Sequence, residues 1–276
     1  MTQSQTSCGQ PPNARPRNKL RSLRGGMLSA LLVFATAGHA ADVRIISSGG
    51  AQQILRTLAP QFEKASGKTV EVVIAVVGTI EQKLLAGERA DIVLLPIPLL
   101  ERIEKNSAFR SEYKAVVAQV GIGVAVREGA TLPDVSTPAA VRALFVQTRS
   151  VSFPDPQQTP SGGHLLNVFE KLGIADVMRP KLTFRNAIEG GINLVRDGEI
   201  ETGLYLATEI LPAKGVRLAG TLPAALQGYI VYAVGVANGL GAASAATQFA
   251  KFLSDPAVRE QWTKAGFELP SSLRAQ

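Results

Sequence analysis

Residues 43–50 read Val43-Arg44-Ile45-Ile46-Ser47-Ser48-Gly49-Gly50, an apolar run that ends in four small residues. The run is typical of a buried strand. Ile54, Leu58 and Phe62 then recur every four residues, which predicts a helix with one buried face. Pro60 lies inside this pattern, and because proline cannot donate the interior hydrogen bond we expect it to kink or split the helix. The fold therefore begins with a βα unit whose loop is made of serine and glycine.

The segment before this unit has the three parts of an export signal. Basic residues occur at positions 15, 17, 19, 21 and 24, with no acidic residue among the first 40. Met27 to Ala37 is an apolar run of 11 residues, and small residues then precede a cleavage position after Ala40. A run of this length is too short to cross a bilayer, which favours a cleaved signal over a retained anchor. We predict a signal peptide over residues 1–40 and a periplasmic protein.

Composition limits the classes of function. Cleavage after Ala40 leaves 24 basic and 22 acidic residues, so the net charge of +7 shrinks to +2 and gives no reason to expect a nucleic-acid partner. The remaining chain has no cysteine, a single histidine and no phosphate-binding Gly-Lys-Ser/Thr loop. We therefore expect no cofactor, no metal site and no disulfide. The mature chain is expected to be soluble and monomeric.

Short apolar runs alternate with helical patterns along the rest of the chain, which predicts βα units and a largely parallel sheet. The predicted strands after the first are 70–75, 91–95, 150–153, 182–184 and 203–206. The predicted helices after the first are 80–86, 99–104, 138–146, 163–172, 187–196, 242–253 and 257–265. Two longer apolar segments, 116–126 and 228–237, indicate crossings between two lobes. The prediction is a two-lobed α/β fold with two crossover strands as hinge. We place residues 41–122 and 230–276 in the first lobe, and 123–229 in the second.

Three stretches resemble type II periplasmic solute-binding proteins of the molybdate-binding group. They are Ile46–Gly50, Leu58–Lys64 and Leu84–Val93. The Ser-Ser-Gly-Gly start is most similar to a subgroup that handles organic anions and includes a periplasmic aconitate isomerase. The resemblance implies two lobes of mixed, mostly parallel sheets that close on a small anion and deliver it to an ABC-type membrane permease. The second loop, Val77-Gly78-Thr79, has one hydroxyl where the molybdate proteins use serines. The ligand therefore stays open between an organic carboxylate and a molybdate-like oxyanion.

Two loops between a strand and a helix are candidate ligand contacts. They contain Ser47, Ser48 and Gly49 in the first loop, and Gly78 and Thr79 in the second. Free N–H groups at a helix start attract carboxylates and oxyanions, and glycine lets a ligand approach the backbone. Ordinary capped turns explain the same residues without a ligand.

The second predicted lobe adds further candidates. Ser161 and Gly162 open a helix that carries His164 in its first turn, where the helix dipole disfavours protonation of the imidazole. Arg185, Asn186 and Tyr205 could hold carboxylates. The alternatives are a packing role for His164 and an exposed Arg185 paired with Glu189, while Glu209 is assigned a structural role.

Two functions remain open from the sequence. The first is a binding protein for an ABC-type importer. The second is an isomerase that shifts a double bond between trans- and cis-aconitate, with His164 as the base. A sensor subunit that binds without transport has the same sequence features.

Overall fold

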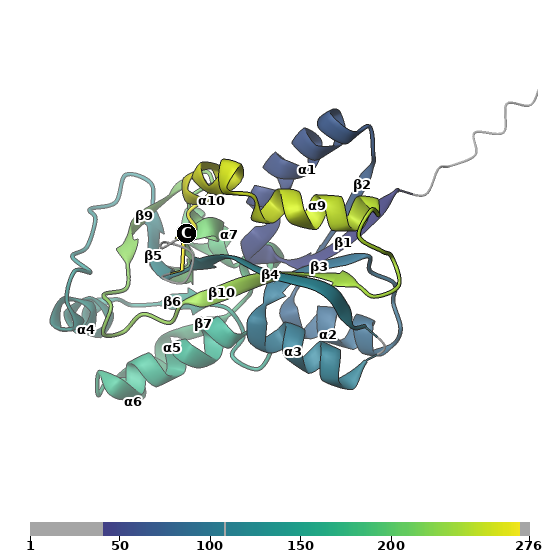
Figure 1. The fold of residues 1–276 in the computed structure, drawn as a ribbon. Helices are drawn as coiled ribbons and strands as arrows, with labels where there is room; N and C mark the ends of the chain where they lie inside the picture. The colour runs from purple at the N-terminus through teal and green to yellow at the C-terminus, as the bar shows by residue number, and fades with distance from the viewer. Residues whose placement is uncertain (1–40, 108, 271–276) are drawn as a thin grey trace, which may run out of the picture. The chain divides into compact units, whose positions relative to one another are not determined.

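The computed structural model describes residues 41–107 and 109–270, so the predicted signal peptide lies outside the described residues. A first five-stranded sheet has the order β2-β1-β3-β10-β4 (Figure 1). Strands β1 (Val43–Ser48), β2 (Val70–Ala75) and β3 (Ile92–Pro96) run parallel. Strand β10 (Ile230–Ala237) pairs antiparallel with β3 and with β4 (Ser111–Val120).

Helices cover both faces of the first sheet. Helices α1 (Gln52–Ser66) and α9 (Ala245–Ser254) lie on one face, and α2 (Val77–Leu85) and α3 (Ile97–Asn106) lie on the other (Figure 1). Successive strand residues point to opposite faces, so Ile45 packs in the core on the α1 side and Ile46 in the core on the α2 side. Both faces of β1 and β3 are buried, which explains the continuous apolar sequence of β3 and the adjacent Ile45 and Ile46 of β1.

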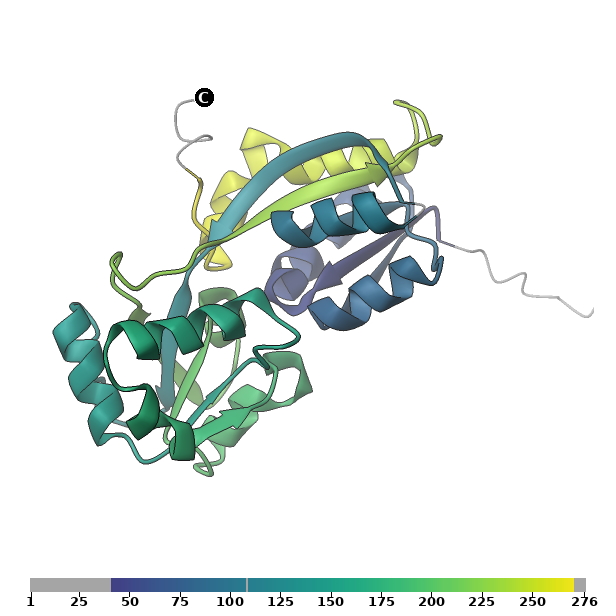
Figure 2. The same ribbon diagram turned by 90° about the horizontal axis from the view of Figure 1, so that it is seen from below.

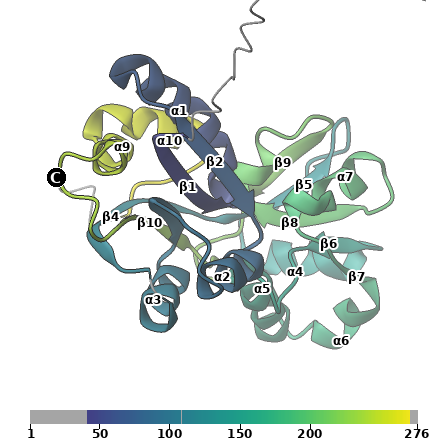
Figure 3. The ribbon, with the colours of Figure 1, turned by 90° about the vertical axis from the view of Figure 1, so that its right-hand side faces the viewer.

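A second five-stranded sheet has the order β7-β6-β8-β5-β9 and lies on the right of Figure 3. Its strands are β5 (Ile122–Arg127), β6 (Val151–Phe153), β7 (Leu182–Phe184), β8 (Thr202–Leu206) and β9 (Val216–Thr221). Its helices are α4 (Pro138–Gln147), α5 (Pro160–Lys171), α6 (Ala175–Met178), α7 (Gly191–Arg196) and α8 (Ala207–Ile210). Phe145 and Phe169 pack edge to face in the core under α4 and α5, while Ile192 and Ile210 pack in a separate core under α7 and α8.

The remaining described elements are short. They are α10 (Arg259–Lys264) and the 3₁₀ turns η1 (Gly49–Ala51), η2 (Arg179–Lys181), η3 (Ala187–Glu189) and η4 (Pro256–Val258).

The chain passes from one sheet to the other through two neighbouring connections. Gly121 alone separates β4 from β5, and residues 222–229 lead from β9 back to β10. Figure 2 shows β4 and β10 side by side on the first-sheet side of these connections. The Gln227 side chain joins the two connections: its Oε1 accepts the Ile122 N–H at 2.7 Å and its Nε2 donates to the Ile122 carbonyl at 3.1 Å. A Cβ at Gly121 would lie 2.7 Å from Gln227 Nε2, so this close approach requires glycine.

The two sheets flanked by helices confirm the predicted fold class, and the six strands predicted by residue range are all present. The predicted lobe boundaries stay a prediction. Helix α1 continues through Pro60, so the expected split does not occur, and a kink at Pro60 stays a prediction. Pro60 and the Arg56 one turn earlier are both exposed, and water can therefore bond the carbonyl that Pro60 leaves free.

Other differences concern element ends. Gly190, in the left-handed region at φ 89°, divides the predicted helix 187–196 into η3 and α7. Helices α2, α3 and α5 each begin two to three residues earlier than predicted, and β4 begins at Ser111. Strand β9 was not predicted, because its sequence Val-Arg-Leu-Ala-Gly-Thr has neither a continuous apolar run nor strict alternation.

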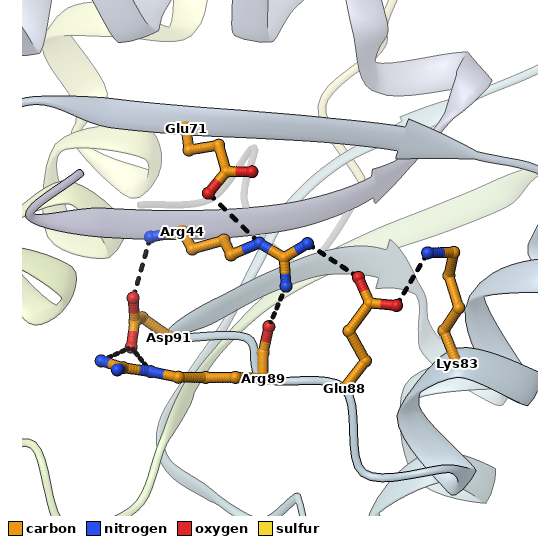
Figure 4. Close-up of polar contacts among 6 residues, drawn as sticks. All are labelled: Arg44, Glu71, Lys83, Glu88, Arg89 and Asp91. Carbon is orange, nitrogen blue, oxygen red and sulfur yellow. Dashed lines mark hydrogen bonds and ion pairs between the residues drawn. The ribbon is translucent and has the colours of Figure 1, made fainter. Parts of the chain in front are cut away.

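Charged side chains join β1, β2 and β3 near their amino ends (Figure 4). Arg44 on β1 pairs with Glu88 at 2.7 Å and with Glu71 on β2 at 3.2 Å. Asp91, just before β3, accepts the backbone N–H of Arg44 at 2.8 Å and the Arg89 guanidinium at 3.0 Å. Asp91 is only 5% exposed, whereas the Glu71 side chain is 51% exposed. Asp91 is therefore the member of this network whose loss leaves a buried group unpaired.

We predict that Asp91→Ala lowers the free energy of unfolding by about 2 kcal/mol, since a buried N–H loses its acceptor. Glu71→Ala is expected to cost less than about 1 kcal/mol, because its ion pair with Arg44 is solvated. Urea denaturation of both variants measures the difference. Equal losses of stability would contradict the assignment of Asp91 as the buried anchor.

Candidate functional site

A cavity of about 40 Å³ lies where strands of both sheets end. Six of its lining residues are the N-cap residues of helices or 3₁₀ turns: Ser48, Val76, Pro96, Thr159, Asn186 and Leu206. They follow or end the strands β1, β2, β3, β6, β7 and β8. In α/β proteins, ligands bind beyond the carboxyl ends of parallel strands because helix starts gather there.

Several of these helix starts have N–H groups that no side chain caps. Among the described residues, the caps at Ser48, Val76, Pro96 and Asn186 show no side-chain hydrogen bond. The first-turn N–H groups of a helix have no partner inside the helix and carry the positive end of its dipole. The lining therefore offers backbone donors to an anion from α2 and from η1 leading into α1, whereas Pro96 before α3 has no N–H to donate.

Two buried hydroxyls add side-chain donors. The Ser48 Oγ and the Tyr232 hydroxyl are 2.8 Å apart, and both residues are less than 5% exposed. Burial raises the pKa of Tyr232, so its hydroxyl stays protonated. A Cβ at Gly50 would lie 2.5 Å from the Tyr232 oxygen, and only glycine therefore leaves room for this pair.

One carboxyl group lines the cavity. Glu209, in α8, accepts the backbone N–H of Leu206 at 3.2 Å, and burial raises its pKa to about 7. Within residues 41–107 and 109–270, no arginine or lysine lines the cavity. An anion there would be held by neutral N–H and O–H donors beside one acid that can be neutral near pH 7.

Four of the predicted ligand residues line this cavity: Ser48, Gly49, Ser161 and Asn186. Ser48 and Gly49 end β1 and begin η1, Ser161 lies in the first turn of α5, and Asn186 precedes η3. Asn186 Oδ1 accepts the backbone N–H of Asp155 at 3.2 Å, and its Nδ2 donates to Glu189 Oε2 at 2.8 Å. These bonds fix the amide at the edge of the cavity.

The other predicted residues lie outside the lining. Gly78 and Thr79 are in the first turn of α2, and Gly162 packs against Pro154 and Pro156. Ser47 Oγ donates to the Leu94 carbonyl at 2.6 Å inside the first sheet. These four residues are part of β1, α2 and α5 and do not line the cavity.

The three long polar candidates of the second sheet are bonded to protein groups. His164 Nε2 donates to the Leu226 carbonyl at 2.8 Å, next to the return connection. Arg185 Nε donates to the Glu189 carbonyl at 2.8 Å, and Tyr205 donates to Ser152 Oγ at 2.8 Å. None of the three contributes to the cavity lining described here.

Sequence reasoning did not identify Tyr232 as a cavity residue and gave Glu209 only a structural role. Glu209 is the one charged residue in the stretch Gly203–Ile210, and that isolation was a usable indication. Tyr232 gave no comparable indication, because its place depends on the pairing of β10 with Pro96 at the end of β3.

No group of three or more potential metal ligands occurs in the described part of the chain. None of the described helices is long and apolar enough to cross a membrane.

Comparison with known proteins identifies the relatives of this chain. It is 26% identical over 214 residues to an aconitate isomerase from Pseudomonas sp, covering 75% of this chain and 80% of the relative. It is 25% identical over 258 residues to the molybdate-binding protein ModA of Escherichia coli (strain K12), covering 87% of this chain and 95% of the relative. The periplasmic molybdate-binding protein of Azotobacter vinelandii has a similar structure, with a TM-score of 0.70 at 18% identity over 83% of this chain and all of the other.

These relatives confirm the predicted molybdate-binding-like group. A family model for bacterial extracellular solute-binding proteins matches residues 43–268, which is most of the chain. The chain belongs to the bacterial extracellular solute-binding protein family.

Proposed function

We propose that this protein captures a small anion in the periplasm and delivers it to an ABC-type importer. The observation that supports this most strongly is the gathering of six N-cap residues around one cavity. Closure of the two sheets about the connections at Gly121 and residues 222–229 would enclose the ligand and present a closed surface to the permease.

The cavity favours recognition by neutral donors. A volume of about 40 Å³ has room for roughly three water-sized groups. That is the scale of a single oxyanion or a single carboxylate group. Backbone N–H groups and the Ser48 and Tyr232 hydroxyls replace the hydration of such a group without the desolvation cost of a buried lysine or arginine.

A thermal-shift screen tests this function with molybdate, tungstate, sulfate, citrate and both aconitates. A ligand present at about 100 times its dissociation constant adds roughly 2.7 kcal/mol to the folding stability. For a chain of this size, that raises the melting temperature by several degrees. An unchanged melting temperature with all six anions would argue against the proposed function.

Two tyrosines form a matched pair of test positions. Tyr232 and Tyr205 are both fully buried, and each hydroxyl lies 2.8 Å from a serine Oγ. Only Tyr232 lines the cavity. We predict that Tyr232→Phe weakens binding of the anion identified in the screen at least fivefold, whereas Tyr205→Phe leaves it within twofold. Calorimetric titration measures both. A larger loss of affinity in Tyr205→Phe than in Tyr232→Phe would indicate that the ligand binds near Tyr205 and not in this cavity.

Glu209 predicts a pH dependence of binding. Its pKa is about 7 because burial disfavours the ionised form. A bound anion disfavours that form further, so the complex holds the proton more tightly than the free protein does. Affinity should then be constant below pH 7 and fall as the pH rises above it, by at most about tenfold per pH unit.

We predict that Glu209→Gln removes this dependence between pH 5.5 and 8.5, because a carboxamide does not titrate. Sulfate or another anion of the screen with constant charge over this range is the probe. Glu81→Gln is the matched control, since Glu81 pairs with Arg102 at 3.0 Å outside the cavity, and that ion pair lowers its pKa. If the affinity of the wild-type protein does not change with pH, Glu209 is not part of the binding site.

A second candidate function is isomerisation of aconitate, favoured by the relative of that name and by an acid–base group in the cavity. The isomerisation takes a proton from the methylene carbon, moves the double bond, and returns a proton to the former vinyl carbon. A carboxyl with a pKa of about 7 suits both steps at neutral pH. Glu209 is a better placed base than His164, whose Nε2 is bonded to Leu226.

Proton NMR of trans-aconitate in heavy water tests this candidate. If the protein is an isomerase, cis-aconitate and deuterated product accumulate with wild type and with His164→Gln, and Glu209→Gln loses at least 99% of the rate. The absence of both cis-aconitate and deuterium uptake with wild type would exclude this reaction and leave the proposal of anion capture untouched. Activity that depends on His164 and not on Glu209 would exclude the base assigned here.

A further inference from the structure

A second cavity of about 220 Å³ adjoins the first and has a different chemistry. The two share a wall made of Gly49, Ala187, Ile188 and Glu209. Beyond that wall the second cavity is lined by three polar residues of α1, Gln52, Gln53 and Arg56, and on the opposite side by Asn193 and Thr208. Elements of both sheets therefore contribute polar groups to it.

Arg56 gives this cavity the cation that the first one lacks. It is exposed, and no carboxylate of the described residues forms an ion pair with it. Among residues 41–107 and 109–270, the only carboxyl in the lining is that of Glu209, which belongs to the shared wall. A guanidinium binds a carboxylate through two parallel hydrogen bonds, so an unpaired arginine in a cavity suits an anionic group.

The buried hydroxyl of Thr208 is a second observation, independent of Arg56, that favours a ligand in this cavity. Thr208 is 2% exposed, and its Oγ1 is one of two buried side-chain polar atoms in the described chain without a hydrogen-bond partner. Leaving a buried hydroxyl unpaired is unfavourable, and native proteins rarely do so without a ligand or water. Asn193 is a further donor: its Oδ1 accepts from Arg196 Nη1 at 3.1 Å, which fixes the amide whose Nδ2 remains available.

The wall between the cavities is thin. Ile188 is 38% exposed, on the three-residue turn η3, and its Cγ2 would lie 2.6 Å from a Cβ at Gly49. One apolar side chain resting on a glycine therefore separates the two cavities, together with the Glu209 carboxyl. A ligand that spans both cavities requires the exposed Ile188 side chain to move off Gly49.

We propose that the second cavity binds the distal carboxylate of an organic anion with two or more carboxylates, with Arg56 as its cationic partner. The proximal carboxylate then occupies the first cavity, among the helix-start N–H groups. This inference rests on the proposed function and names its ligand class: a di- or tricarboxylate that spans both cavities. A single tetrahedral oxyanion fills only the first cavity and does not reach Arg56.

The test is calorimetric titration of wild type, Arg56→Gln and Thr208→Val with citrate, trans-aconitate, sulfate and molybdate. Arg56→Gln should weaken citrate or trans-aconitate at least tenfold and leave sulfate and molybdate within twofold. Thr208→Val should weaken the same polycarboxylate several-fold. Lys64→Gln, which removes an exposed cation from the same helix, is the matched control and should change nothing.

The outcomes separate this inference from the proposed function. Equal affinity of wild type and Arg56→Gln for a bound polycarboxylate would overturn the second subsite. Binding of sulfate or molybdate without any binding of citrate or trans-aconitate would also overturn it and leave anion capture standing. An equal weakening by Arg56→Gln and Lys64→Gln would show a general charge effect and not a contact. Failure of all four anions to bind wild type would overturn both proposals.

Discussion

The chemistry of the cavity at the strand ends depends on backbone N–H groups that helices leave unpaired at their first turns. Parallel strands of both sheets end at one place, and six N-cap residues consequently line one cavity. Each uncapped helix start carries partial positive charge that must be met by water or by a ligand. This charge is the physical basis of the anion site that we propose, since no arginine or lysine among the described residues lines the cavity.

The same constraint explains the place of Glu209. An ionised carboxylate would compete with an anionic ligand for these donors, and burial reduces that competition by raising the pKa of Glu209 to about 7. The Glu209 carboxyl then has two forms of similar free energy at neutral pH. Its neutral form can donate a hydrogen bond to an anion, and its ionised form can accept a proton from a bound acid. The two proposed functions, anion capture and proton transfer, would therefore depend on the same environment of Glu209.

One side chain and one glycine join the two connections between the sheets. Gln227 bonds to both connections around Gly121, and the absent Cβ of Gly121 permits that contact. Above these connections, Ile188 of the second sheet's η3 lies against Gly49 of the first sheet's η1. Glycine thus occurs at both of these contacts, because a Cβ at Gly121 would lie 2.7 Å from Gln227 Nε2 and one at Gly49 would lie 2.6 Å from Ile188 Cγ2.

The sequence by itself determined the order of strands and helices, since buried apolar runs and four-residue spacing depend only on neighbours in the chain. It also identified the first loop, because Ser48 and Gly49 directly follow a strand. It failed for the irregular edge strand β9 and for a split at Pro60, which does not occur because the proline lies on an exposed helix face where water can bond the freed carbonyl. Only the tertiary structure decided which polar residues meet. The contact of Tyr232 with Ser48 and the presence of Arg56 and Thr208 in one cavity lining depend on how distant strands and helices pack. The Leu226 carbonyl accepts a hydrogen bond from His164, which the sequence had predicted as a ligand contact.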